Sequence, residues 1–165
     1  MRRSVKGHTV ILLCVVMLCF FLSGCSSLLL SFGGNGDWDF ALPNGYEIIR
    51  INGYDIILGK EMTESSSSYV IERYVVAFSY ADSYVGICRL PIPERAELQD
   101  IKQSLEKAQI SDYLYYIVQT ESDSILGPYT YEAYSEECSS LNKPELLHWI
   151  YTDDIHEDGS WDPHR

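Results

Sequence analysis

Residues 46–59, YEIIRINGYDIILG, decide the expected fold of this chain. Two runs within them, 46–51 and 54–59, are rich in isoleucine and tyrosine, which are typical of β-strands. The dipeptide Asn52-Gly53 separates the runs. Such a pair favours a two-residue type I′ turn, whose two central residues need positive φ angles. The sequence therefore predicts a β-hairpin in which Gly53 has a positive φ angle.

The short loop would also set the register of the two strands. It places Ile49 opposite Ile56, and Arg50 opposite Asp55 as a cross-strand charge pair. A slip of one residue would move the apolar side chains to the wrong face, so the turn and the apolar pattern support the same register. One face of the predicted hairpin then carries Ile49, Ile51, Tyr54, Ile56 and Leu58.

Three further strands are expected where β-branched and aromatic residues cluster, at residues 69–78, 84–90 and 113–120. The connecting segments are expected to be a polar loop at 61–68, a turn at 81–83 and a short extended piece that ends at Gly127-Pro128.

The first expected helix covers residues 94–108. Its apolar side chains recur at helical spacing and make one stripe. The stripe consists of Leu98, Ile101, Leu105 and Ala108.

Two more helices are expected in the C-terminal third. Thr130 can cap one that runs to residue 141, and Pro144 can open a short one that runs to residue 151. The side chains expected to face inward are Tyr134, Cys138, Leu141, Leu147 and Ile150. The chain is therefore predicted to be an α+β domain, with an antiparallel sheet of about five strands and two or three helices packed on one face.

The N-terminus has the three parts of a signal peptide. Basic residues at positions 2, 3 and 6 precede an uncharged apolar run of 14 residues, 9–22, and then Leu22-Ser23-Gly24-Cys25. This ending resembles the lipobox of bacterial lipoproteins, which implies cleavage before Cys25 and lipidation of its thiol. One alternative is a transmembrane helix, but a span needs about 20 apolar residues. A secretory signal cleaved elsewhere is the other alternative.

The chain is expected to have four parts: a lipoprotein signal peptide (1–24), a lipid-anchored flexible tether (25–44), a single α+β domain (45–151) and an acidic disordered tail (152–165). Removing residues 1–24 takes away three of the 12 Lys and Arg and none of the 24 Asp and Glu, so the net charge goes from −12 to −15. Such a chain repels nucleic acid and anionic lipid headgroups. The lipid anchor is therefore expected to hold it at the membrane.

Several short motifs together resemble a family of short uncharacterised bacterial lipoproteins. Besides the lipobox and a Gly-rich tether, they are Leu42-Pro43-Asn44-Gly45-Tyr46, Tyr115-Tyr116-Ile117-Val118, and Gly127-Pro128 ahead of an aromatic-containing helix. The resemblance covers most of the chain after Cys25. It implies a location at the extracytoplasmic face of the cell membrane, and it carries over no assigned activity.

Side chains that could carry chemistry are few. Cys88 and Cys138 are expected to be reduced and buried, with a disulfide between them as the alternative. His148 is the only histidine within 45–151, and a serine or thiol nucleophile would need a base positioned beside it. The tail residues could suggest a cation site, but their spacing matches no EF-hand loop. They are Asp153, Asp154, His156, Glu157, Asp158, Asp162 and His164.

The sequence therefore predicts a membrane-anchored, non-enzymatic protein that needs no metal or cofactor and has no nucleic-acid partner. The leading hypothesis is that it binds a protein or an envelope component through its tyrosines. An inhibitor or immunity-type lipoprotein, whose acidic face would neutralise a basic toxin or enzyme, is the first alternative. A hydrolase with a site hidden in the sequence is the second. A pocket that holds a perturbed histidine or carboxylate would favour the enzyme, and a flat acidic or aromatic patch would favour the binder.

Overall fold

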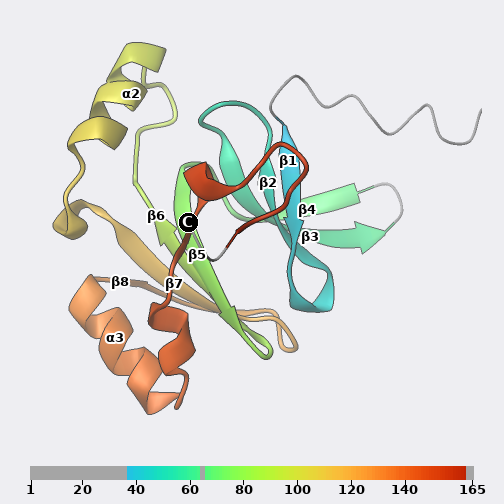
Figure 1. Ribbon diagram of the computed structural model, residues 1–165. Coiled ribbons are helices and arrows are strands. Elements are labelled where there is room, and N and C mark those ends of the chain that lie inside the picture. The colour runs from blue at the N-terminus through green and yellow to red at the C-terminus, as the bar shows by residue number, and fades with distance from the viewer. Residues whose placement is uncertain (1–36, 64–65, 163–165) are drawn as a thin grey trace, which may run out of the picture. The chain divides into compact units, whose positions relative to one another are not determined.

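A computed structural model describes residues 37–63 and 66–162 (Figure 1). The predicted signal peptide, Cys25 and most of the predicted tether lie outside these residues. No helix in the described part of the chain is long and apolar enough to cross a membrane.

The described strands form two antiparallel sheets, one of four strands and one of five. The four-stranded sheet has the order β1-β2-β3-β4 and contains β1 (Trp38–Ala41), β2 (Tyr46–Arg50), β3 (Ile56–Thr63) and β4 (Ser66–Ile71). The five-stranded sheet has the order β8-β7-β6-β5-β9 and contains β5 (Val75–Ala81), β6 (Tyr84–Arg89), β7 (Leu114–Gln119), β8 (Ser124–Tyr129) and β9 (Ile150–Tyr151).

The hairpin predicted at residues 46–59 is present, but its predicted register is wrong by one residue. Ile49 pairs with Ile57, and Arg50 pairs with Ile56. As a result, Ile48 and Leu58 face each other at 0% exposure on the core side, while Ile51 is 43% exposed. Burial of the Ile48–Leu58 pair between the two sheets therefore outweighs the preference of Asn-Gly for a tight turn.

Asn52 holds the wider loop that this register requires. Its side-chain Oδ1 accepts hydrogen bonds from the backbone N–H groups of Tyr54 and Asp55, and its Nδ2 donates to the Asp55 carboxylate. Gly53 is not among the residues with positive φ. Asp55 lies 3.7 Å from the Arg73 Nε atom, so its ion-pair partner is Arg73 and not the predicted Arg50.

Replacing Gly53 with valine is therefore expected to change the free energy of unfolding by less than about 0.5 kcal/mol. A Cβ atom at this position would meet nothing closer than the Arg50 Nη2 atom at 3.9 Å. A two-residue type I′ turn would instead make the same change cost about 1 kcal/mol or more. Chemical denaturation of wild type and Gly53→Val distinguishes the two loop conformations.

The predicted strand at 69–78 is divided between the two sheets. β4 ends at Ile71 and β5 begins at Val75, and both Arg73 and Tyr74 between them have positive φ angles, of 42° and 60°. The turn predicted at 81–83 is confirmed, because Ala81 pairs with Tyr84 across a two-residue loop. The polar loop predicted at 61–68 is wrong at both ends, since β3 continues to Thr63 and β4 begins at Ser66.

Two α-helices and four 3-10 helices complete the described fold. They are α2 (Leu98–Lys107), α3 (Tyr131–Ser140), η1 (Pro43–Gly45), η2 (Ile110–Asp112), η3 (Pro144–Leu147) and η4 (Thr152–Asp154). Thr130 caps α3 as predicted, with its side chain accepting from the Ala133 N–H. The third predicted helix is shorter than expected: η3 stops at Leu147, and Ile150 belongs to β9. β8 also runs through Gly127-Pro128, which the sequence placed at the end of an extended piece.

The two faces of the five-stranded sheet have different partners. One face packs against the four-stranded sheet through residues such as Phe78 and Ile87 with Ile48 and Leu58. The opposite face carries α2 and α3 (Figure 1). Tyr134 and Cys138 of α3 are both fully buried there. The α+β class and the placement of the helices on one face are thereby confirmed.

The packing of α2 is looser than that of α3. Ile101, Leu105 and Ala108 of its predicted stripe are half-buried against a cluster around Tyr74. Leu98 is 57% exposed, and α2 contains no fully buried residue. This helix is therefore held by only part of its apolar face.

Both ends predicted to be flexible are folded in part. Trp38, assigned to the tether, is 4% exposed in β1. In the predicted disordered tail, Thr152 and Ile155 are 3% and 6% exposed, and Ile155 forms a β-bridge with Trp161. The reason is that these segments supply apolar side chains to the core between the two sheets.

Candidate functional site

A cavity of about 660 Å³ lies on the helical side of the five-stranded sheet. Its walls come from β5, β6, β7 and β9, from α2 and the start of α3, and from single residues of β3 and η2 and two of η4. Seven aromatic side chains line it, which are Tyr54, Tyr74, Tyr113, Tyr115, Tyr131, Trp149 and Tyr151. We call this space the aromatic cavity.

The sheet and its flanking turns place these rings. Tyr113, in extended conformation just before β7, and Tyr115 within β7 are two residues apart and therefore project to the same face. Tyr74 reaches the cavity from the positive-φ corner between the sheets. Tyr131 is the first residue of α3, and Trp149 just precedes β9. Residues far apart in the sequence thus converge on one space.

Two of the other lining rings, those of Tyr131 and Trp149, contact the ring of Tyr115. Its centroid lies 5.5 Å from that of Tyr131 with an interplanar angle of 63°, and 5.8 Å from that of Trp149 with an angle of 52°. Such tilted contacts are the favoured geometry of aromatic pairs. Because the rings are mutually inclined, they present faces and edges in several directions.

Burial sets the pKa values of the cavity residues Cys88, Tyr113 and Tyr115. Desolvation raises the pKa of the Cys88 thiol to about 12, and it also raises the pKa values of the Tyr113 and Tyr115 hydroxyls. The charged forms of these groups are disfavoured because the site is poorly solvated. Cys88 is therefore a neutral thiol and a poor nucleophile at physiological pH.

The charged lining residues come from two elements. Lys102 and Glu106 lie on α2, and Asp153 lies in η4. The Lys102 ammonium sits 5.8 Å from the centroid of the Tyr54 ring. This is within the distance at which a cation is attracted to an aromatic face.

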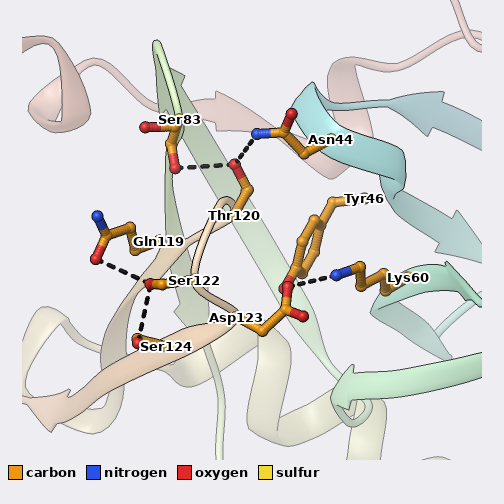
Figure 2. A network of polar contacts seen from close by, with 9 residues as sticks. All are labelled: Asn44, Tyr46, Lys60, Ser83, Gln119, Thr120, Ser122, Asp123 and Ser124. Atoms are coloured by element: carbon orange, nitrogen blue, oxygen red, sulfur yellow. Dashed lines mark hydrogen bonds and ion pairs between the residues drawn. The ribbon is translucent and has the colours of Figure 1, made fainter.

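A second cluster, which we call the polar junction, ties the two sheets together (Figure 2). The Thr120 hydroxyl accepts a hydrogen bond from Asn44 at 2.7 Å and donates to the Ser83 carbonyl at 2.9 Å. Figure 2 also shows Asp123 between the Tyr46 hydroxyl and Lys60, with which it forms an ion pair. Nearby, the Ser122 hydroxyl donates to the Gln119 side-chain oxygen and is also hydrogen-bonded to the Ser124 hydroxyl.

The pKa shifts in the polar junction are those of a contact that stabilises the fold. The hydrogen bond from Lys60, followed by that from Tyr46, lowers the pKa of Asp123. Burial, followed by the Asp123 carboxylate, raises the pKa of Tyr46 to about 12. These shifts strengthen a hydroxyl–carboxylate–ammonium contact and activate neither a base nor a nucleophile. We therefore take the aromatic cavity as the candidate functional site.

The residues weighed from the sequence are scattered in the structure. His148 is exposed at the end of η3. Cys88 and Cys138 are both free and buried, and Cys138 does not line the cavity. In the described part of the tail and elsewhere in the described residues, no three His, Cys, Asp or Glu side chains gather as metal ligands. Cys25 lies outside the described residues.

Sequence reasoning missed the cavity itself. The pair Tyr113 and Tyr115 on a predicted strand was a signal that two aromatic rings share one face. Tyr74, Tyr131 and Trp149 carry no such local signal, because only the tertiary fold brings them to the strand. The sequence therefore predicted binding through tyrosines but did not indicate which tyrosines lie together.

Most of the domain matches the model of a known protein family. Residues 43–152 match the model of a family described as Protein of unknown function (DUF3997). All seven aromatic side chains of the cavity lie within the matched residues. No curated protein and no solved structure matches the chain.

Proposed function

The chain belongs to the DUF3997 family, which brings no activity with it, and we propose that it is a lipid-anchored, non-enzymatic binding protein at the extracytoplasmic face of the cell membrane. The lipobox-like Leu22-Ser23-Gly24-Cys25 supports the anchor at Cys25. The partner is a protein or an envelope component.

The aromatic cavity is the observation that carries the binding function. Its volume of about 660 Å³ lies in the range of about 300–1,000 Å³ typical of ligand sites. Tyr131 and Tyr151 at its lining are 37% and 55% exposed, so a partner can reach aromatic surface there. Tyrosine and tryptophan are also the side chains that most often anchor binding partners.

The same lining disfavours a hydrolase. The described lining residues include no histidine, and the pKa of Cys88 is raised to about 12. Thiol catalysis needs a lowered pKa or an adjacent base. The net charge of −12 favours a second candidate, an inhibitor or immunity-type lipoprotein that neutralises a basic toxin or enzyme, because charge complementarity speeds such encounters.

Both parts of the proposal can be tested in native membranes. Cys25→Ala is expected to abolish labelling by a lipid precursor and to release the protein from the membrane, because no other cysteine stands directly after the signal-like segment. Labelling of Cys25→Ala at the wild-type level would overturn the anchor.

The binding part uses photo-crosslinking in the same membranes. Tyr151→Ala is expected to weaken the specific crosslinks of the wild type by at least about fivefold, since aromatic anchors of this kind contribute about 1 kcal/mol or more. Tyr69→Ala is the matched control, because Tyr69 is 60% exposed on β4 and does not line the cavity. Equal loss in both variants, or no loss in either, would contradict binding at the cavity.

A further inference from the structure

The walls of the aromatic cavity carry the features by which proteins hold organic cations. Tyr131 and Trp149 are inclined to Tyr115 by 63° and 52°. Rings set at such angles can turn electron-rich faces toward one guest from different sides. A flat aromatic ligand would instead need two near-parallel rings.

The tyrosine wall already holds a cation within the structure. The Lys102 ammonium lies over the Tyr54 ring at 5.8 Å. Lys102 is exposed on α2, and α2 itself contains no fully buried residue. Because Lys102 is exposed, its ammonium can leave the Tyr54 ring, and another cation can take its place there.

The charge at the cavity also suits a cation. Glu106 and Asp153 give the lining two carboxylates against the single ammonium of Lys102. The whole chain has a net charge of −12, so its field attracts cations and repels anions. An anionic ligand would be repelled by the two carboxylates of the lining and by the net negative charge of the chain.

We propose that the aromatic cavity binds a small organic cation that carries a methylated ammonium group on a short apolar stem. This inference rests on the proposed binding function and adds a class of small ligand, free or carried by an envelope lipid, to its partners. The methylated head lies against Tyr131 and Trp149, which are partly exposed and pack on the buried Tyr115 ring, and Glu106 and Asp153 balance its charge. Methyl groups suit this site because a methylated ammonium is weakly hydrated and loses little when the rings replace its water.

The test compares choline with 3,3-dimethyl-1-butanol, its neutral isostere of the same shape, by calorimetric titration of the full lipidated protein in detergent. Choline is expected to bind at least about tenfold more tightly, because cation–π attraction is absent for the isostere. Equal affinities would overturn the inference, as would failure of choline to bind up to millimolar concentrations.

Two variants link the binding to this cavity. Lys102→Met is expected to raise the affinity for choline several-fold and to leave that for the isostere unchanged, because it removes a competing charge. Lys107→Met is the matched control, since Lys107 lies on the same helix and does not line the cavity. Tyr131→Leu is expected to weaken choline binding at least about fivefold. If the affinity for choline is unchanged in both Lys102→Met and Tyr131→Leu, choline binds elsewhere and the inference is overturned.

A second arm separates a free solute from a lipid headgroup, which share this chemistry. The protein is placed in phosphatidylglycerol vesicles with or without phosphatidylcholine. Weaker choline binding in the presence of phosphatidylcholine assigns the cavity to a headgroup, and unchanged binding assigns it to a solute. If choline fails but crosslinking through Tyr151 persists, only the ligand class is wrong. If the cavity-dependent crosslinks are also absent, the binding function itself fails.

Discussion

Replacing Gly86 with alanine is expected to destabilise the domain by about 3 kcal/mol, because the added methyl group has no space to occupy. Gly86 lies in β6, opposite Ser79 of β5. A Cβ atom there would lie far inside van der Waals contact with the Tyr134 hydroxyl and the Ser79 hydroxyl. Neither oxygen is free to move, since both donate hydrogen bonds to the Leu146 carbonyl, at 2.9 Å and 2.7 Å.

The collision is costly because it occurs in a fully enclosed place. Tyr134 and Leu146 are 0% exposed, and Ser79 is 1% exposed. Moving either hydroxyl would leave a buried carbonyl with fewer partners, which costs about 1 to 3 kcal/mol. The absence of a side chain at Gly86 therefore makes room for the Tyr134 side chain of α3 against the sheet.

Chemical denaturation of Gly86→Ala measures this effect, and Gly59→Ala is its matched control. Gly59 is also a buried strand glycine, but the one close contact of its added Cβ would be with the terminal Cδ1 atom of Ile49, while the Glu47 side chain lies at ordinary van der Waals distance. Ile49 is half-buried and can rotate, so the control is expected to cost less than about 1 kcal/mol. In a Ser79→Ala, Tyr134→Phe background the Gly86→Ala step is expected to cost about 1 kcal/mol or less, because the colliding oxygens are gone. An equal cost in both backgrounds would contradict the contact.

Replacing Gly159 with alanine is expected to detach the C-terminal segment from β1, at a cost of about 2 to 4 kcal/mol in the stability of that segment. Gly159 has a φ angle of +74°, and an added Cβ would collide with the Asp39 backbone carbonyl. The segment would open locally, because its contacts with the core are few compared with those of the sheets. Ile155 and Trp161, which pair across the bridge, would lose their packing.

Amide hydrogen exchange across residues 152–162 measures this opening. Gly45→Ala is the matched control, because Gly45 has nearly the same φ angle, +75°, but nothing lies within 4 Å of its added Cβ. The control is expected to cost only the backbone strain, about 1 kcal/mol. If Gly159→Ala left the protection of this segment unchanged, the segment would not be docked as described.

Several structural elements could be predicted from short stretches of sequence, because interactions between neighbouring residues determine them. Thr130 caps α3 as expected, and residues 81–83 turn the chain between two paired strands. The apolar positions Tyr134 and Cys138 recur at helical spacing and are both fully buried. In each case the signal and the structure it produces lie within one helix or one turn.

The hairpin at residues 46–59 shows where local signals stop. Asn52-Gly53 is a strong signal for a two-residue turn, yet the strands are shifted by one residue and Asn52 closes a wider loop with its own side chain. The choice depends on Ile48 and Leu58, which are buried only because a second sheet covers them. That second sheet begins where Arg73 and Tyr74 turn the chain with positive φ angles, which neither residue type predicts.

The sequence by itself determined the antiparallel α+β class, the two main helices and the acidic character of the chain, because periodicity, capping and charge are properties of neighbouring residues. Only the tertiary structure decided the division into two sheets, the docking of Trp38 and Ile155 at the ends of the domain, and the aromatic cavity. The physical reason is that each of these depends on burial between segments far apart in the chain. Tyr74, Tyr115 and Trp149 become one site only when the sheet is assembled.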